Sequence, residues 1–146
     1  MRDGRIDIWI NSYGGFTHTA MHVIEAIELA RRNDVIVRTI VPSLALSAGS
    51  LMAVVGTPGE RYIARKAEHL LHYGTIGGLA HTPEQVERSK AYQKRSFNNI
   101  LSHYRDNSEV PDLENKISDD GFFVPAAQAI KWKLADKYMD KLVIGY

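Results

Sequence analysis

Apolar and polar residues form three different patterns along roughly the first forty residues. In the segment 5–10, three isoleucines alternate with Arg5, Asp7 and Trp9, the period-two pattern of a β-strand. Between residues 20 and 30 the apolar positions recur at helical spacing, which predicts an amphipathic helix. Segment 35–41 is almost entirely apolar and β-branched, as in a strand covered on both faces. Strand, helix and strand in this order predict a βαβ unit in a parallel sheet.

The rest of the chain continues this α/β pattern. The small residues of segment 43–56 predict a buried helix, and the sequence Thr82-Pro83-Glu84-Gln85 is a capping box that starts a helix running to about Tyr104. The first half of that helix is polar, so we expect it to project from the core or to contact another subunit. The remaining predicted elements are short strands at 61–64 and 68–74, a short helix near 113–117, a helix at 125–136, and a strand or tail at 141–146.

Length and composition narrow the class of protein. With 146 residues, 45% of them apolar, the chain is expected to form a single domain over residues 1–146 with a packed core. Eighteen basic and seventeen acidic residues give a net charge of +1, which indicates neither a nucleic-acid nor a membrane partner. The absence of cysteine excludes disulfides and thiolate chemistry. No apolar run has the ~20 residues of a membrane helix and no signal peptide is evident, so we expect a cytoplasmic protein.

Two motifs resemble ligand sites only in part. His18 and His22 share a helix face, but no third ligand has a telling spacing and the glutamate of H-E-x-x-H is missing, so solvated side chains are the better interpretation. The glycine-rich segment 74–78 lacks the G-K-[ST] ending of a phosphate-binding loop and is interpreted as a turn. We therefore predict no metal and no cofactor.

Ser47 is a stronger candidate for chemistry. It lies in the sequence Ala-Leu-Ser-Ala-Gly, at the start of the predicted buried helix that follows a parallel strand. A serine hydroxyl becomes a nucleophile only when a nearby base takes its proton, and a backbone amide at such a turn can stabilise the oxyanion of acyl transfer. A serine that merely caps the helix fits the same pattern, so spacing alone leaves both interpretations open.

Four sequence blocks, taken together, resemble the ClpP-type (caseinolytic) self-compartmentalising serine peptidases. The block INSYGG at 10–15 resembles that family's I-N-S-P-G-G, and 45–63 resembles its A-S-M-G/A segment with the apolar helix and turn that follow. HLLHYG at 69–74 resembles its M-I-H-Q-P strand, and 119–136 resembles its Asp-aromatic stretch and last helix. The blocks occur in family order and cover nearly the whole chain.

This resemblance implies roles for individual residues. Ser47 would be the nucleophile and His72 the general base, with Asp120 or, after a one-residue shift, Asp119 orienting the imidazole. The backbone amides of Gly15 and Ala48 would form the oxyanion hole, and a side chain on Gly15 would obstruct the substrate or misdirect its amide. Substrate would bind as an added strand along Gly14 and Tyr73.

The resemblance also implies an architecture and partners. The expected fold consists of stacked βαβ units of the ClpP/crotonase type, with segment 73–106 forming a projecting handle. The expected assembly is a homo-oligomer of stacked heptameric rings that hydrolyses unfolded polypeptides or peptides without ATP, and is normally fed by a partner ring ATPase. Alternatives are a non-catalytic or regulatory ring subunit and a crotonase-like acyl-CoA enzyme.

Three departures from the family pattern qualify these expectations. The chain begins a few residues before the INS strand, so it resembles a short form without the N-terminal region that helps to dock the ATPase. Tyr13 replaces a proline and would loosen the turn before the glycines. Lys133 replaces a glycine, and a positive φ there would strain the backbone by on the order of 1 kcal/mol.

Overall fold

The predicted βαβ unit is present at the start of the chain. A computed structural model describes residues 4–74, 81–117 and 120–145. Strand β1 (Arg5–Trp9), helix α1 (Thr17–Arg32) and strand β2 (Ile36–Val41) follow one another, and β1 pairs parallel to β2. Helix α1 buries the apolar face that its periodicity predicts, through residues such as Ile24 and Ile27. No side chain caps its start, because the cap residue is Phe16, whose side chain has no hydrogen-bonding group.

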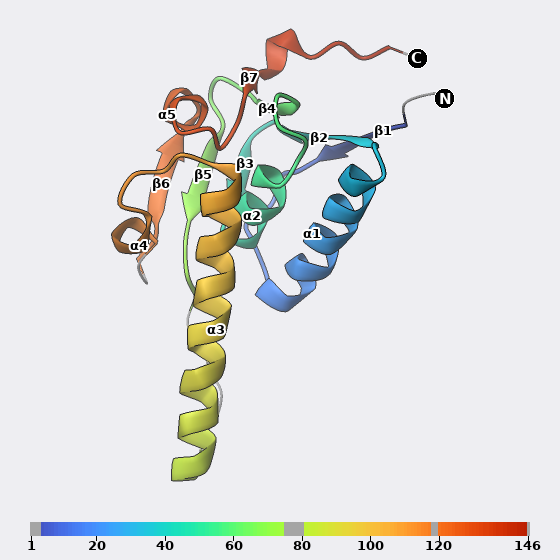
Figure 1. The fold of residues 1–146 in the computed structure, drawn as a ribbon. Coiled ribbons are helices and arrows are strands. Elements are labelled where there is room, and N and C mark those ends of the chain that lie inside the picture. Colours follow the sequence, from blue (N-terminus) through green and yellow to red (C-terminus); the bar gives the residue numbers. More distant parts are fainter. Residues whose placement is uncertain (1–3, 75–80, 118–119, 146) are drawn as a thin grey trace.

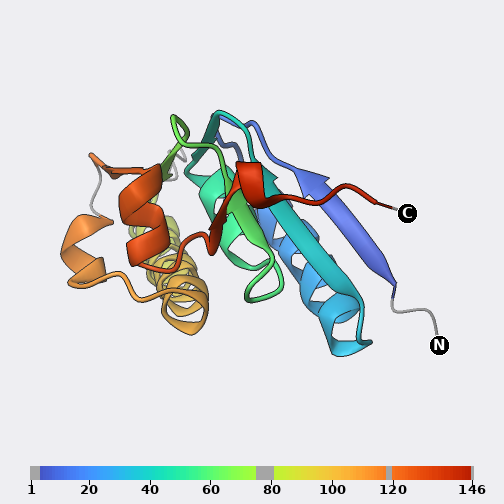
Figure 2. The same ribbon diagram turned by 90° about the horizontal axis from the view of Figure 1, so that it is seen from above.

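The strands form two sheets, seen from two directions in Figures 1 and 2. The first sheet has the order β1-β2-β4-β7, with β4 at Arg61–Ile63 and β7 at Lys137–Tyr138, and its pairs are all parallel. The second has the order β3-β5-β6, in which β5 (Glu68–Leu71) runs parallel to β3 (Leu44–Leu46) and antiparallel to β6 (Phe122–Pro125). This is the mixed α/β architecture with parallel strands that the sequence predicts.

Segment 43–56 is not the single helix that its composition predicts. It forms a three-residue strand, β3 (Leu44–Leu46), followed by helix α2 (Ala48–Val54), and Ser47 lies between them. The strand forms because it has partners on both sides: β5 pairs along one edge and Ser12 bridges to Ala45 on the other. Such long-range pairing leaves no periodic signal in three residues.

Helix α2 is the most enclosed helix of the fold. It packs against α1, against α3 (Pro83–Asn107) and against strands of both sheets, and it lies at the centre of the ribbon in Figure 1. Six of its seven residues are buried. The small residues that identified the segment as buried therefore allow neighbouring elements to approach on every side.

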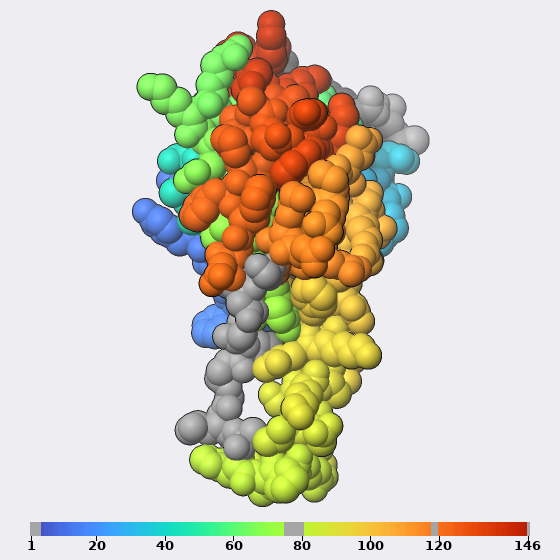
Figure 3. Space-filling model, turned by 90° about the vertical axis from the view of Figure 1, so that its left-hand side faces the viewer, coloured from blue at the N-terminus to red at the C-terminus, as the bar shows by residue number. Residues whose placement is uncertain are grey.

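Helix α3 (Pro83–Asn107) projects from the rest of the molecule, as predicted. Thr82 accepts a hydrogen bond from the Gln85 amide while the Gln85 side chain accepts from the Thr82 amide, so the capping box is confirmed. Its buried residues, Ile100, Leu101 and Tyr104, all lie in the last two turns. In Figure 3 the yellow and yellow-green part of this helix extends below the body of the molecule.

The C-terminal segment completes both sheets. Strand β6 (Phe122–Pro125) had no counterpart among the predicted elements, and the helix expected at 125–136 is shorter, α5 (Ala126–Lys131). Lys133 has a φ of 59°, which meets the condition under which strain was expected at this position. The remaining elements are helix α4 (Leu113–Lys116) and a 3-10 turn, η1 (Met139–Lys141).

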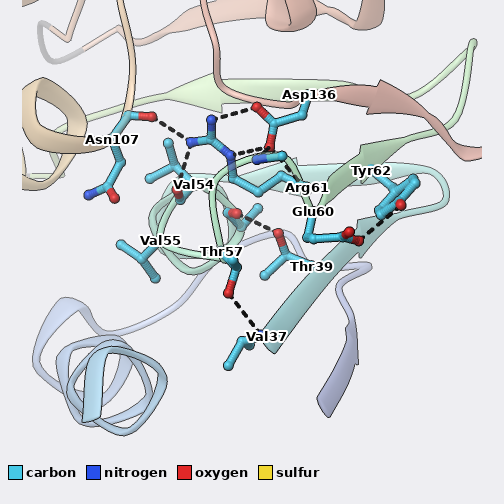
Figure 4. Close-up of polar contacts among 12 residues, drawn as sticks. Val37, Thr39, Val54, Val55, Thr57, Glu60, Arg61, Tyr62, Asn107 and Asp136 are labelled. Carbon is cyan, nitrogen blue, oxygen red and sulfur yellow. Dashed lines mark hydrogen bonds and ion pairs between the residues drawn. The ribbon is translucent and has the colours of Figure 1, made fainter. Parts of the chain in front are cut away.

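Buried Arg61 joins the ends of several elements (Figure 4). Its guanidinium makes a two-pronged ion pair with Asp136 and donates to the carbonyls of Val54, at the end of α2, and Asn107, at the end of α3. A cation beside two helix C-termini is favourable because the helix dipoles are negative there. Within the described part of the chain, no helix is both long and apolar enough to cross a membrane.

Candidate active site

The Ser47 side chain lies where strand β3 turns into helix α2. The Ser47 amide donates to the Leu70 carbonyl of β5 at 2.9 Å, and the Ser47 carbonyl accepts from Ser50 and Leu51 in the first turn of α2. The residue is therefore held by the neighbouring strand on one side and by its own helix on the other. Ser47 as a whole is only partly buried.

The backbone of Ser47 is strained. Its φ is 53° and its ψ is −118°, a conformation that a residue with a Cβ rarely adopts. Such strain persists where the surrounding structure enforces it, and it is concentrated at functional sites. A serine on a sharp strand-to-helix turn is the geometry that exposes the nucleophile in α/β-hydrolases. Since Ser47 makes no side-chain cap to α2, the alternative role as a capping serine is not realised.

His72 follows β5 and faces Ser47. The distance from Ser47 Oγ to His72 Nδ1 is 3.4 Å, at the long end of a hydrogen bond and typical of a catalytic pair without substrate. For Nδ1 to accept the serine proton, the ring must carry its own proton on Nε2. Gly121, with φ at 74°, lies against the opposite edge of the ring, where a Cβ would approach His72 Cδ2 to 3.3 Å.

The two glycines after Tyr13 differ in the space that the chain leaves for a side chain. Gly14 has a φ of 105°, and a Cβ there would lie 3.0 Å from both the Leu46 carbonyl oxygen and Ser47 Cβ, and 3.6 Å from the Ala48 amide nitrogen. At Gly15, by contrast, a Cβ would meet nothing in the described chain within 4 Å. The steric demand within the chain therefore falls on Gly14. The expectation that a Gly15 side chain would obstruct substrate stays a prediction.

Ser12 and Gly49 complete the turn, and the sequence had not indicated either. The Ser12 hydroxyl accepts a hydrogen bond from the Gly14 amide, and Gly49 lets the first turn of α2 pack on Ser12, since a Cβ would come within 3.0 Å. The Ala48 amide is the first of α2 and has no carbonyl four residues earlier in the helix to bind. The glycine loop thus lies beside an amide with donor capacity.

The other predicted site residues are not all in contact with Ser47 and His72. Asp120 is exposed and precedes Gly121, but within the described residues no hydrogen bond or ion pair joins its carboxylate to His72. Its alternative, Asp119, lies outside the described residues. Tyr73 directs its side chain to α3, where its hydroxyl donates to the Gln93 carbonyl at 2.7 Å and its ring packs on Phe97. Its backbone remains the part that could bind a substrate strand.

The generic candidates do not form a metal site. His18 and His22 are exposed, with ring centroids 6.3 Å apart, and the described residues contain no group of three side chains suited to hold a metal. The glycine-rich segment 74–78 lies outside the described residues after Gly74. A second serine–histidine contact, Ser50 with His69, is present in the core and was not foreseen.

A parallel α/β fold with a serine on a strained strand-to-helix turn and a histidine within reach of its hydroxyl is typical of serine hydrolases. Comparison with known proteins is more specific: residues 1–141 match the profile of Clp protease. The chain belongs to the Clp protease family.

Individual relatives are distant in sequence. The ATP-dependent Clp protease proteolytic subunit of Streptococcus mutans serotype c is 26% identical over 140 residues, which cover 92% of this chain and 68% of the relative. The protein of the same name from Streptococcus thermophilus is 28% identical over 109 residues, covering 73% of this chain and 53% of the relative. The matches therefore span 53% to 68% of the length of these proteins.

Proposed function

We propose that this chain is a serine-type endopeptidase in which Ser47 is the nucleophile and His72 the general base. The observation that carries the proposal is the 3.4 Å contact between Ser47 Oγ and His72 Nδ1 at a strained turn. Membership of the Clp protease family supports peptide bonds as the substrate. No metal or organic cofactor is needed for this chemistry.

In the proposed reaction, Ser47 Oγ attacks the scissile carbonyl while its proton passes to His72. The amides of Gly15 and Ala48 donate to the oxyanion of the tetrahedral intermediate, and His72 returns the proton to the leaving amine. Water then attacks the acyl-enzyme by the same route and releases the second product. Asp120 or Asp119 would stabilise the charged imidazole.

Substrate would bind as an extended strand between the Gly14 loop and the residues after His72. Backbone hydrogen bonds supply most of the affinity in such strand addition, so broad sequence tolerance is expected. The exposed aromatic residues Tyr13 and Phe16 flank the glycine loop. They would contact apolar side chains of the bound peptide.

The proposed assembly is a homo-oligomer of stacked rings, with α3 at the contact between rings. The polar, projecting first half of α3 and exposed apolar residues such as Trp9 support association between copies. The relatives are named as subunits of ATP-dependent proteases, so a partner ATPase ring is proposed to supply unfolded substrate. Native mass spectrometry would give the number of copies. A cytoplasmic location stays a prediction.

The decisive test is covalent labelling with a fluorophosphonate, followed by mass spectrometry of the modified peptide. We expect the label on Ser47 in the wild type, none in Ser47→Ala, and full labelling in the matched control Ser102→Ala on the exposed face of α3. Hydrolysis of short fluorogenic peptides should fall by roughly 10⁴–10⁶ in Ser47→Ala and His72→Ala. A folded wild type that is neither labelled nor active would overturn the proposal and favour a non-catalytic ring subunit.

The third member of the triad needs its own comparison. Asp119→Asn and Asp120→Asn are nearly isosteric, and only the aspartate that orients His72 should matter for catalysis. We expect one variant to lose activity by on the order of 10⁴ while the other keeps it. Equal activity of both variants and the wild type would remove the aspartate from the mechanism.

A further inference from the structure

A second serine and histidine, which the proposed reaction does not use, are bonded in the core behind the candidate site. Ser50 Oγ lies 2.9 Å from His69 Nδ1, and both residues are completely buried. Ser50 follows Ser47 by three residues, in the first turn of α2, and His69 precedes His72 by three residues, in β5. The bond therefore joins the helix that carries one candidate catalytic residue to the strand that leads to the other.

The chemistry of this pair differs from that of the outer pair. Burial, together with the nearby charge of Arg61, lowers the pKa of His69 to about 4, so its ring is neutral at neutral pH. The Tyr104 hydroxyl of α3 also interacts with the Ser50 side chain, although without the geometry of a full hydrogen bond. Since no part of Ser50 or His69 is exposed, a substrate cannot reach them, and a second catalytic centre is excluded.

The pair carries a polar cost that packing alone does not explain. His69 Nε2 is buried, and within the described part of the chain it has no hydrogen-bond partner. A buried imidazole with one unsatisfied nitrogen is less favourable for stability than an apolar residue of similar size. The bond to Ser50 therefore has a role that a leucine could not fill: it links α2 to β5 in a fixed direction.

The position of α2 relative to β5 decides the geometry of the candidate site. Ser47 is the residue from which α2 starts, and its carbonyl accepts from the Ser50 amide at 2.9 Å, so a shift of Ser50 moves Ser47 with it. The outer contact of 3.4 Å is already at the long end of hydrogen-bond distances. A further displacement of about 1 Å would break it, and misplacements of this size can lower rates by about 10²-fold.

We propose that Ser50 and His69 are positioning residues that hold Ser47 within reach of His72. The proposal rests on the proposed function, because it assigns the pair a role in that same site. It predicts that removing the link changes the turnover number more than the affinity for substrate. It also predicts that this change is separable from any change in stability.

The test uses three variants and one matched control in the full chain, with kcat, KM and Tm measured for each. Ser50→Ala should lower kcat by about 10- to 100-fold with KM unchanged. Ser50→Ala/His69→Leu replaces both partners by apolar groups, which should return Tm towards the wild-type value while kcat stays low. His69→Asn keeps Ser50 and places an amide near the position of Nδ1, where it can bind the Ser50 hydroxyl. Its kcat should therefore stay close to the wild-type value.

The control removes a buried hydroxyl of β2 that binds the carboxyl end of α2. Thr39 Oγ1 donates to the Ala53 carbonyl at 2.7 Å, so Thr39→Val should lower Tm without lowering kcat. A wild-type kcat in Ser50→Ala/His69→Leu would overturn the positioning role. The role would also be overturned if kcat fell together with Tm in every variant, Thr39→Val included. If the double variant does not fold, Ser50→Ala decides on the same readouts.

A crystal structure of Ser50→Ala separates this inference from the proposed function. The distance from Ser47 Oγ to His72 Nδ1 should increase beyond hydrogen-bond reach in the variant, whether or not the wild type hydrolyses peptides. An unchanged distance would overturn the positioning role by itself. An inactive and unlabelled wild type whose distance still responds to Ser50→Ala would overturn only the proposed function.

Discussion

At its amino end, α2 starts from a serine with a positive φ. Beside it are an amide without an intrahelical acceptor and a serine–histidine contact of 3.4 Å. At its carboxyl end, the last carbonyls are bound by side chains from three different elements. Thr39 donates to the Ala53 carbonyl, Arg61 to that of Val54, and Arg31 to that of Val55. One short helix therefore has a strained, incompletely satisfied end and a saturated end.

The difference shows where this fold places its conformational strain. Unsatisfied groups and unusual φ values persist only where the rest of the structure enforces them, and they mark sites with a task beyond stability. The carboxyl end supplies that enforcement, because its hydrogen bonds fix α2 against β2, β4 and α1. We therefore expect substitutions at the carboxyl end to change stability, and those at the amino end to change activity.

The largest expected effect is on stability, from Arg61→Met. The Arg61 and Asp136 side chains are only 5% and 12% exposed, and the variant leaves the carboxylate unpaired together with two helix carbonyls. Breaking a buried pair from one side lowers the free energy of unfolding by about 3–5 kcal/mol. Urea denaturation would measure this, with Arg88→Met on the exposed face of α3 as a control that changes little. A small loss for Arg61→Met would contradict the comparison.

Next in size is the effect of Gly14→Ala on activity. A Cβ at this positive φ would lie 3.0 Å from Ser47 Cβ, so the loop must move away from Ser47 and the Ala48 amide. Loss of one oxyanion donor typically lowers kcat by about 10²–10³-fold. Gly59→Ala is the matched variant, since Gly59 also has a positive φ, of 87°, but a Cβ there meets nothing in the described chain within 4 Å. Equal losses in kcat for the two variants would show that the loop's position relative to Ser47 is not what matters.

The pH dependence of stability should distinguish the two ends as well. The pKa of His69 is lowered to about 4 from its ordinary 6.5, so between these values the unfolded chain binds a proton that the folded chain does not. The stabilisation is complete above pH 6.5 and is lost as the pH falls towards 4, by about 1.4 kcal/mol per pH unit. Urea denaturation from pH 7 to 4 should show this slope, and it should be absent in Ser50→Ala/His69→Leu. An equal slope in that variant would exclude His69 as its source.

Asp136 at the carboxyl end should titrate in a separate range. Burial alone would raise the pKa of Asp136, but the hydrogen bonds and charge of Arg61 and the amides of Arg61 and Gly59 lower it below its ordinary 3.8. Its stabilisation is therefore complete above pH 3.8 and is lost only at lower pH. The two ends of α2 thus respond to acid in different ranges, His69 first and Asp136 afterwards.

Sequence patterns predicted the elements whose signal is local. The alternation in 5–10 and the capping box at Thr82 each depend on residues within one strand or one turn, and both elements are present. The pairing of Ser47 with His72 came from the family resemblance, because a spacing of 25 residues says nothing about proximity without a fold. The structure then placed their side chains 3.4 Å apart.

What the sequence could not predict depends on contacts between distant residues. β3 is too short for a periodic signal and forms through its pairing with β5 and Ser12. The Ser50–His69 bond joins a helix to a strand 19 positions away, and the Arg61–Asp136 pair spans 75. The identity of each of these residues, taken alone, does not indicate its partner. Their partners are defined only after the chain has folded.

The smallest effect should come from Thr39→Val, which removes a single bond from the carboxyl end. The residue is buried, and valine keeps the shape while leaving the Ala53 carbonyl without this donor. One such bond contributes about 1 kcal/mol to the free energy of unfolding, well below the loss expected for Arg61→Met. Thr39→Ser keeps the hydroxyl and tests whether the bond or the methyl group matters. Because β2 carries Thr39 far from the turn at Ser47, peptide hydrolysis should be unchanged in both variants, and reduced activity would show that the two ends of α2 are not independent.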